Sequence, residues 1–512
     1  MSKHDLDNPE LYVELLHHSS RDDPRHPIDV DKTESCPEPL QLALEMDEGL
    51  QKSVRTLIGA LANVIAKYHR NPPAVAARLT QQDQKQGLRV HIYFTFNDTT
   101  WDEYIFSNTS AHLSYLLDEL RSAAQPVIQE SPPPYKIDYR LLQTLSWRVH
   151  QFCLGTFIHR VQKGQNKFYL QATVNRLYEM RRDPENALGD KSVKDYLLMC
   201  TVLEEVEELV DTIDKRKAHL AKEQRADDLP LEEKPDALLT LQESNSLLVS
   251  YTSLTKHNLP DDHNPGDYKK LKALDAYLKE TGLDTEFARW VPKVFKLFQS
   301  TAYLINLSYS KRLSRILTDL VKIMNYVVSN SPLPDDLLND PTDFIDLVLL
   351  PRLTDLNNKR RRHFTIHAEI ALVLHLQQHG LASSTYPFLG LSKLSCTACV
   401  ELMRLINGNS QSPIWLTSGT HCKIYRSWVY PDSISNPEIK PMLAHRLQKL
   451  LFREFVDFAR SQKIARRLSD NSIESQGITI HDVHGEHSEN LEHMEARVMQ
   501  RIEQETMKRL SH

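Results

Sequence analysis

Four residues in the C-terminal third of the chain have the types and the spacing of a metal site. His367 and Glu369 are separated by one residue, and Cys396 and Cys399 by two. Two cysteines three positions apart at the start of a helix point the same way, so both sulfurs can reach one ion. The positive end of the helix dipole lowers the pKa of thiols there, which favours thiolate binding to a metal. With the imidazole of His367, the segment predicts three ligands for one ion.

Zinc is the ion that such a ligand set favours. Two thiolates and one imidazole leave the fourth tetrahedral position open for water, as in catalytic zinc sites, and zinc lowers the pKa of that water toward neutrality. Glu369 lies close enough along the chain to exchange protons there. Two alternatives stay open: a closed structural zinc site with His421 or Cys422 as fourth ligand, and a site that keeps its metal without activity.

The joint pattern is more specific than either half of it. H-x-E pairs recur in the tail, at His484-Glu486, His487-Glu489 and His493-Glu495. Only the pair at His367 precedes both an apolar helical segment and a C-x-x-C, and C-x-x-C occurs once in the chain.

The elements around these residues alternate between strands and helices. A helix is expected over 367–379, closed by Gly380 as its C′ residue, and another over 395–406. Short apolar runs predict the strands, which are 344–350, 363–366, 386–391, 414–417 and 423–429.

The segment from about 345 to 435 resembles the zinc nucleobase deaminases, which share H-x-E on one helix and P-C-x-x-C on the next. FLGLSKLSCTAC (388–399), SGTHCKIY (418–425), Trp428 and Pro431 are similar to the Orientia-type deaminase-like family that is expanded in fungi. Ser395 stands where proline is usual in the wider superfamily, but serine is a good N-cap, so the helix start is kept.

The resemblance implies a chemistry and roles for the four residues. His367, Cys396 and Cys399 would bind Zn²⁺, and Glu369 would move protons during hydrolytic deamination of cytosine or adenine. The substrate would be a nucleic acid or a nucleotide, so the chain is expected to be an enzyme.

Two further residues are candidate substrate contacts. The resemblance places a histidine beside the pocket at His421, and Trp428 could stack on a base. For Trp428, as for the other aromatic candidates Tyr386, Phe388 and Trp415, core packing is the plainer alternative.

The domain organisation follows from composition and periodicity. We expect a disordered N-terminus over 1–37, a mainly α-helical domain over 38–330, a deaminase-like zinc domain over 344–440 and a charged tail, helical or disordered, over 441–512. The fold class is therefore a largely α-helical N-terminal domain followed by a cytidine-deaminase-like α/β/α domain with a mixed sheet. Within the helical domain, 88–107 is expected to form a short hairpin, and 286–330 to be helical.

Composition limits the setting and the partners. The net charge of -6 argues against global attraction to nucleic acid, so a polynucleotide would need a local basic patch. Lys359–Arg362 could be such a patch, but a solvated turn is an equally good alternative. Lys215–Lys217 is expected to be only exposed charge. Six cysteines without an apolar leader or a membrane-length apolar run predict an intracellular protein of cytoplasm or nucleus, without a transmembrane segment.

The rival function belongs to another class. The large helical part, the charged tail and the acidic balance also suit a zinc-stabilised scaffold without turnover, whose helical domain binds protein partners. An open pocket at the metal beside Glu369 would favour the enzyme, whereas a fourth protein ligand would favour the scaffold.

Overall fold

The computed structural model divides the chain into two compact units. The first is made of residues 31–331 and 365–421, and the second of residues 1–30, 332–364 and 422–512. The residues that the structure describes are 48–68, 71–81, 88–97, 103–129, 139–162, 166–181, 190–223, 238–256, 269–283, 285–309, 321–325, 366–409, 415–421, 423–425, 428–451 and five residues between 9 and 16. No helix in these ranges is long and apolar enough to cross a membrane.

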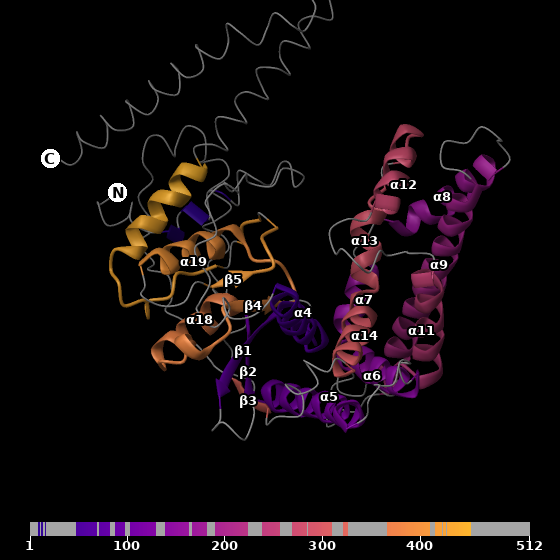
Figure 1. Ribbon diagram of the computed structural model, residues 1–512. Coiled ribbons are helices and arrows are strands. Elements are labelled where there is room, and N and C mark those ends of the chain that lie inside the picture. The colour runs from indigo at the N-terminus through magenta and orange to yellow at the C-terminus, as the bar shows by residue number, and fades with distance from the viewer. Residues whose placement is uncertain are drawn as a thin grey trace, which may run out of the picture. The chain divides into compact units, whose positions relative to one another are not determined.

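A mixed sheet in the first unit joins segments that are far apart in the sequence (Figure 1). Its strand order is β3-β2-β1-β4-β5. The central strand β1 runs antiparallel to both neighbours, β2 and β4, whereas β3 runs parallel to β2 and β5 parallel to β4. The strands are β1 (Pro73–Gln81), β2 (Leu88–Phe96), β3 (Val321–Asn325), β4 (Phe388–Leu391) and β5 (Leu416–Thr417).

The two faces of the sheet are covered by different helices. Val75 and Phe94 belong to the hydrophobic core that includes α4 (Glu48–Val64). On the other face, the ring of Tyr93 lies 6.1 Å from that of His375 in α18 (Ala368–Gln378). Residues 74–77 of β1 are buried on both faces, which the small side chains of PAVAARLTQ permit. The result is a helix–sheet–helix sandwich with β1 at its centre.

The sheet therefore takes strands from both sides of the boundary expected between 330 and 344. Residues 38–330 supply helices, as expected, but also β1, β2 and β3. The long helical part lies between β2 and α18 in the sequence, so it is placed within the chain segments that build the sheet rather than before them. Its helices are α5 (Glu103–Gln129), α6 (Tyr139–Phe152), α7 (Leu154–Gln162), α8 (Asn166–Arg181), α9 (Asp190–Glu223), α11 (Leu241–Lys256), α12 (Lys269–Glu280), α13 (Phe287–Val294) and α14 (Lys296–Ser308).

Several sequence expectations need correction. The hairpin pairs 73–81 with 88–96, whereas Tyr104–Phe106, expected to be its second strand, begins α5. Residues 321–325, expected to be helical, form β3 because a short apolar run suits either period. The described residues within 423–429 form no strand.

The expected disorder of 1–37 is wrong for the few N-terminal residues that the structure describes. Residues 9, 10, 12, 13 and 16 are helical, and Tyr12, Val13 and Leu16 are buried. In the same unit, the amide of Tyr430 donates to Glu10 Oε1 at 2.8 Å. The strands expected at 344–350 and 363–366 lie outside the described residues, apart from Ile366, which is not in a strand.

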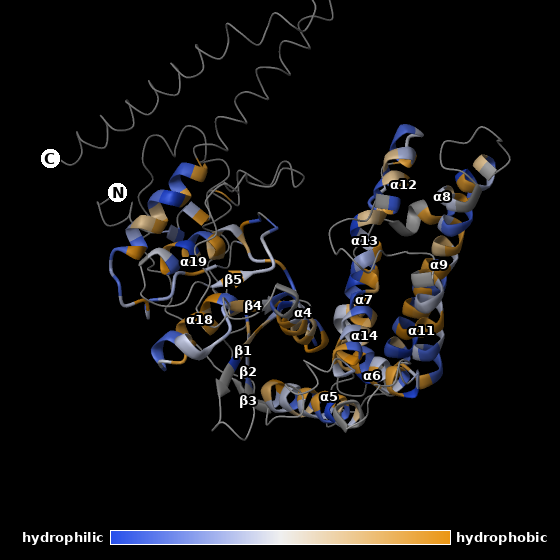
Figure 2. Ribbon diagram, in the orientation of Figure 1, coloured by the Kyte–Doolittle hydropathy of each residue, from blue (hydrophilic) through white to orange (hydrophobic). Residues whose placement is uncertain are grey.

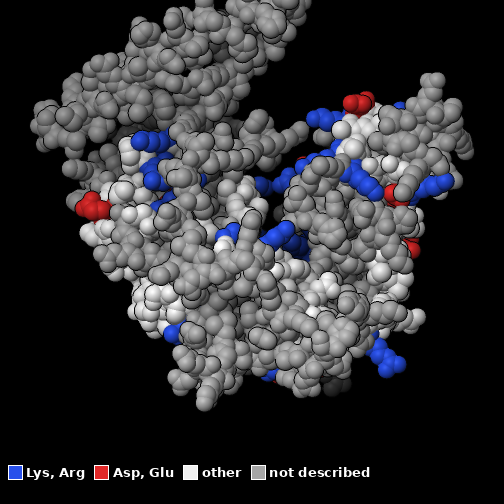
Figure 3. All heavy atoms as spheres, viewed as in Figure 1, with Lys and Arg blue, Asp and Glu red and all other residues white. Residues whose placement is uncertain are grey.

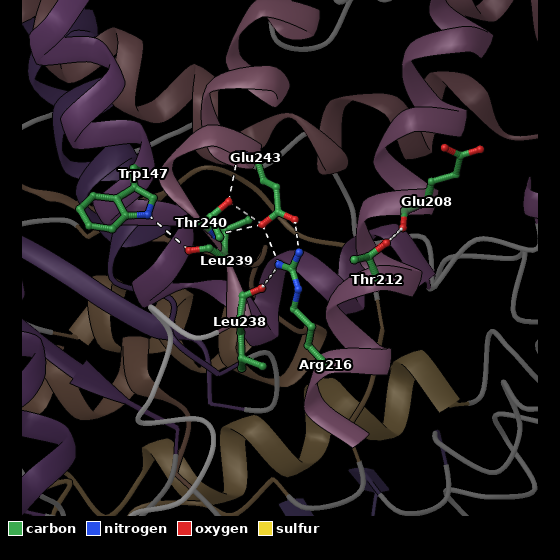
Figure 4. Close-up of polar contacts among 8 residues, drawn as sticks. All are labelled: Trp147, Glu208, Thr212, Arg216, Leu238, Leu239, Thr240 and Glu243. Atoms are coloured by element: carbon green, nitrogen blue, oxygen red, sulfur yellow. Dashed lines mark hydrogen bonds and ion pairs between the residues drawn. The ribbon is translucent and has the colours of Figure 1, made fainter. Parts of the chain in front are cut away.

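The helices of the first unit supply most of its hydrophobic core, and orange hydrophobic residues alternate with blue hydrophilic ones along their ribbons in Figure 2. An ion pair between Arg216 of α9 and Glu243 of α11 joins these two helices (Figure 4). The guanidinium of Arg216 donates to both carboxylate oxygens of Glu243, at 2.8 and 2.6 Å, and to the carbonyl of Leu238. Glu243 also accepts from the amide and hydroxyl of Thr240, a capping box at the start of α11. Arg216 holds the pKa of Glu243 down at about 2, so the middle residue of Lys215–Lys217 is structural rather than merely exposed charge.

On the face drawn in Figure 3, the described Lys and Arg side chains form several separate groups rather than one continuous patch. The basic run Lys359–Arg362 lies outside the described residues.

Helix α4 approaches β4 so closely that a side chain at Gly390 has no room. A Cβ added there would overlap the carbonyl of Ile58 and lie 2.8 Å from the amide nitrogen of Gly59. Gly390 is paired with Val75 of β1, so this contact fixes α4 against two strands that are distant in the sequence.

We expect Gly390→Ala to lower the free energy of unfolding by about 3 kcal/mol, because backbone on both sides must shift. Chemical denaturation checks the value. Gly408→Ala is the matched control, since nothing lies within 4 Å of its added Cβ, and it should leave stability unchanged or raise it slightly. Equal stability of the two variants would contradict the close approach.

Two buried histidines join the helices and remain neutral. The ring of His112 stacks on Phe152 at 3.9 Å, and its Nε2 lies 3.1 Å from the carbonyl oxygen of Val64. His150 packs against Phe298, with ring centroids 4.0 Å apart. Burial lowers the pKa of His112 to about 3 and that of His150 to about 4, from 6.5.

Acid should therefore destabilise the first unit. Because both folded-state pKa values lie below 6.5, the unfolded chain binds protons first, and stability present above pH 6.5 is lost as the pH falls toward 4. Each histidine contributes a slope of about 1.4 kcal/mol per pH unit. Denaturation curves across this range should show a shallower slope for His112→Gln or His150→Gln and the wild-type slope for the exposed His445→Gln. An unchanged slope in all three variants would refute this assignment.

Candidate metal centre

The predicted metal ligands meet where two helices begin. His367 immediately precedes α18, and Cys396 immediately precedes α19 (Thr397–Asn409), with Cys399 in the first turn of α19. The helices expected over 367–379 and 395–406 are formed as α18 and α19, and the strand expected over 386–391 is formed as β4. Gly380 follows α18 with a φ of 64°, as expected for its C′ residue. In this arrangement the histidine and the two cysteines lie at the positive ends of two helices, which stabilise thiolates.

The ligand atoms converge on one point. His367 Nδ1 lies 3.4 Å from Cys396 Sγ and 3.3 Å from Cys399 Sγ. The nitrogen and the two sulfurs all lie within 4.8 Å of one another, and the three side chains are buried. Within the ranges that the structure describes, this is the one group of three or more His, Cys, Asp or Glu side chains close enough to hold an ion. The four cysteines among these residues form no disulfide, so the sulfurs of Cys396 and Cys399 are not consumed by a bridge.

The electrostatics of the cluster favour a thiolate at Cys396. Burial raises the pKa of this thiol, but hydrogen bonds from Cys399 and the charge of His367 outweigh it and bring the pKa well below 9.0. The amide of Cys399 donates to Cys396 Sγ at 3.4 Å, so Cys396 also caps α19. For His367, burial lowers the pKa, but the Cys396 thiolate prevails and raises it. A cation that replaces the imidazole proton would satisfy both groups, so the residues fit a metal ion.

Glu369 lies in the first turn of α18 beside the cluster. Its side chain is 5% exposed, and burial raises its pKa, partly offset by the charge of His367 and by the Cys399 thiol. A carboxyl group in these surroundings binds a proton more readily than an exposed glutamate does.

Asn97, which the sequence analysis did not single out, completes the start of α18. Its Oδ1 accepts from the amide of Ala368 at 2.8 Å across 271 residues of chain. His367 is the N-cap residue but makes no capping hydrogen bond through its side chain, so Asn97 satisfies this helix end and Nδ1 stays directed at the sulfurs. The available signal was an asparagine directly after the alternating strand 88–96.

His421 is tied to the same loop. Its amide donates to the carbonyl of Ser395 at 3.3 Å, and Thr420 Oγ1 donates to the same carbonyl at 2.9 Å. Ser395 precedes the ligand Cys396, so the backbone of His421 lies beside the cluster, and its side chain is partly exposed. His421 does not belong to the group of ligand atoms. Cys422, the other proposed fourth ligand, lies outside the described residues.

The aromatic candidates are mostly core residues. Trp415 is 2% exposed, Tyr386 is 1% exposed and bonded through its hydroxyl to the carbonyl of Gln51, and Phe388 is 6% exposed. Trp428 is 1% exposed and belongs to the second unit. Its role as a substrate contact stays a prediction. The H-x-E pairs of the tail lie outside the described residues.

Three buried ligands at the starts of two helices, with a carboxylate two residues after the histidine, form the arrangement that zinc nucleobase deaminases share. Residues 366–432 match the family described as OTT_1508-like deaminase, which supports a deaminase-family assignment for this segment. The match contains α18, β4, α19 and β5, but not β1 and β2 of the same sheet. No curated protein matches the chain. No solved structure matches it either.

Replacing either sulfur ligand should abolish tight metal binding. We expect about one divalent ion per wild-type chain and a small fraction of that in Cys396→Ser and Cys399→Ser, since two remaining ligands bind weakly. Metal analysis after dialysis measures the ratio. Cys200→Ser is the control, because burial raises the pKa of that thiol to about 12 and it lies outside the cluster. Full metal content in the Cys396 and Cys399 variants would contradict the site.

Proposed function

We propose that this chain is a zinc-dependent hydrolytic deaminase that acts on cytosine or adenine in a nucleic acid or a nucleotide. The observation that carries the proposal is the convergence of His367, Cys396 and Cys399 with Glu369 beside them. The match of residues 366–432 to a deaminase family supports the same reaction class.

Zinc is favoured because its usual ligands are thiolate and imidazole, and three protein ligands are the number that catalytic zinc sites use. When bound, it would supply Lewis acidity, which makes hydroxide available near neutral pH. His367, Cys396 and Cys399 would hold it. The remaining chemistry belongs to the protein side chains and the substrate.

Glu369 is the proposed proton carrier. The overall reaction adds water to the amino-bearing ring carbon, C4 of cytosine or C6 of adenine, breaks the exocyclic C–N bond and releases ammonia. The Glu369 carboxylate would accept a proton from water, pass it to the ring nitrogen next to that carbon, and carry the second proton to the departing amino group. Its burial beside the cluster supports this role because bulk water competes little there.

Substrate recognition is proposed to include His421. Its backbone position beside Ser395 supports this, since the partly exposed imidazole lies next to the loop that carries Cys396. Trp428 is included as a stacking candidate on the sequence pattern alone. The proposed binding partner is the nucleobase-containing substrate. From composition we propose that the protein is located inside the cell.

Mass spectrometry of the zinc-loaded full chain with bases, nucleosides, nucleotides and single-stranded oligonucleotides tests the proposal. Deamination adds about one dalton to the product. No mass change with any substrate class would favour the zinc-stabilised scaffold.

Glu369→Gln should keep its metal and lose ammonia release by about 10³-fold, because glutamine cannot carry the proton. The control is Glu401→Gln, which alters another buried glutamate, one whose partner is Arg404 in α19 at 2.7 Å. If the Glu369 variant is folded, holds its metal and still turns over at the wild-type rate, the assigned role is refuted.

A further inference from the structure

An open groove lies between α9 and α11, which are neighbouring helices of the first unit (Figure 1). Its volume is about 720 Å³. Glu205 of α9 lines one side, and the other side is lined by six residues of α11, which are Leu241, Gln242, Asn245, Ser246, Val249 and Ser250. The groove shares no residue with the cluster of candidate metal ligands.

The groove follows one side of α11. Its α11 residues recur at intervals of four, at 241, 245 and 249 and again at 242, 246 and 250, which is the spacing of one helix face. The residues between them on the opposite side, Ser244, Leu247 and Leu248, are buried. From 241 to 250 the face extends about 14 Å along the helix axis, which is enough for two to three turns of another helix.

Two polar contacts fix the walls of the groove. Near the start of α11, Glu243 is paired with Arg216 of α9. Two turns further along α11, Ser250 Oγ donates to Glu205 Oε2 at 2.8 Å, which holds the Glu205 carboxylate at the groove. Because both walls are formed within the chain, a partner that binds there need not order them.

Two apolar side chains of the groove are exposed. Leu241 is 46% exposed and Val249 is 54% exposed. They lie about two turns apart on the same face of α11. Single exposed apolar residues are common on protein surfaces, but two in line along one groove can both be covered by the apolar face of a helix that lies in it.

The charge at the groove is negative. None of its described lining residues is Lys or Arg, and Glu205 is exposed. Glu208, about one turn along α9, is exposed as well. Between Lys194 and Lys215, α9 contains several Asp and Glu residues and neither Lys nor Arg. A surface that complements this groove must therefore carry positive charge.

We propose that the groove between α9 and α11 binds a basic amphipathic helix of a partner protein. Apolar side chains of that helix cover Leu241 and Val249, and an arginine or lysine beside them pairs with the carboxylate of Glu205. The apolar stem of such a basic side chain can lie along Val249 while its charge reaches the carboxylate. The acidic residues of α9 would repel a phosphate backbone, so nucleic acid does not fit this surface.

Fluorescence anisotropy with the full chain tests the proposal. The probe is a fluorescein-labelled synthetic amphipathic helix of about 18 residues, with leucines along one stripe and arginines on both sides of it. We expect a Kd in the micromolar range that rises with salt concentration, because salt screens exposed charges. The same peptide with glutamate in place of every arginine should not bind.

Variants of the groove locate the binding site. Glu205→Gln and Val249→Ser should each raise the Kd of the arginine peptide by about 5-fold, since each removes one contact. The matched controls are Glu280→Gln, which alters an exposed glutamate of α12, and Met442→Ser, which alters an apolar side chain that is 42% exposed. Both controls should keep the wild-type Kd, and all four variants should keep the wild-type circular dichroism spectrum.

Three results would overturn the proposal: no binding of the arginine peptide, equal binding of the arginine and glutamate peptides, or an unchanged Kd in either groove variant. Analytical ultracentrifugation of the chain alone tests for a different occupant. A dimer that Val249→Ser converts to a monomer would show that a second copy of this chain fills the groove instead.

Discussion

The pairing of β1 with both β2 and β4 is the constraint on which the rest of the structure depends. Residues 73–81 contact 88–96 on one side and Gly390 and Leu391 on the other, so one strand joins the early and late parts of the chain. Gly390 lets α4 lie directly on this junction. Since β4 leads into the loop that ends at Cys396, the position of the sulfur ligands follows from this pairing.

The electrostatics of two helix starts favour the convergence of the candidate metal ligands. At the start of α18, Asn97 supplies the hydrogen-bond acceptor for the amide of Ala368, and Nδ1 of His367 faces the sulfur of Cys396 in front of α19. Both helix starts thus favour thiolates beside them.

The sequence predicted the local parts of the site well and the long-range parts poorly. The spacing of H-x-E and C-x-x-C predicted which side chains converge, because each pair lies in one helical turn. It could not predict that 73–96 builds the centre of the sheet, since β1 is rich in alanine and pairing partners over 290 residues apart leave no local periodicity. Asn97 was missed for the same reason: its role depends on a contact with Ala368 that only the assembled sheet creates.

The hydrogen bond between Asn97 and Ala368 means that the chain returns to the end of β2 after 271 residues, which include the helical part and β3. Closing a flexible loop of 271 residues costs about 2 kcal/mol more in chain entropy than closing one of 30 residues. The helices, which form by local contacts, shorten that loop when they fold first. His367 and Cys396 are only 29 residues apart, so their convergence does not itself require this closure. The step that does require it is the packing of α18 and β4 against β1 and β2, which we expect to follow folding of the helical part.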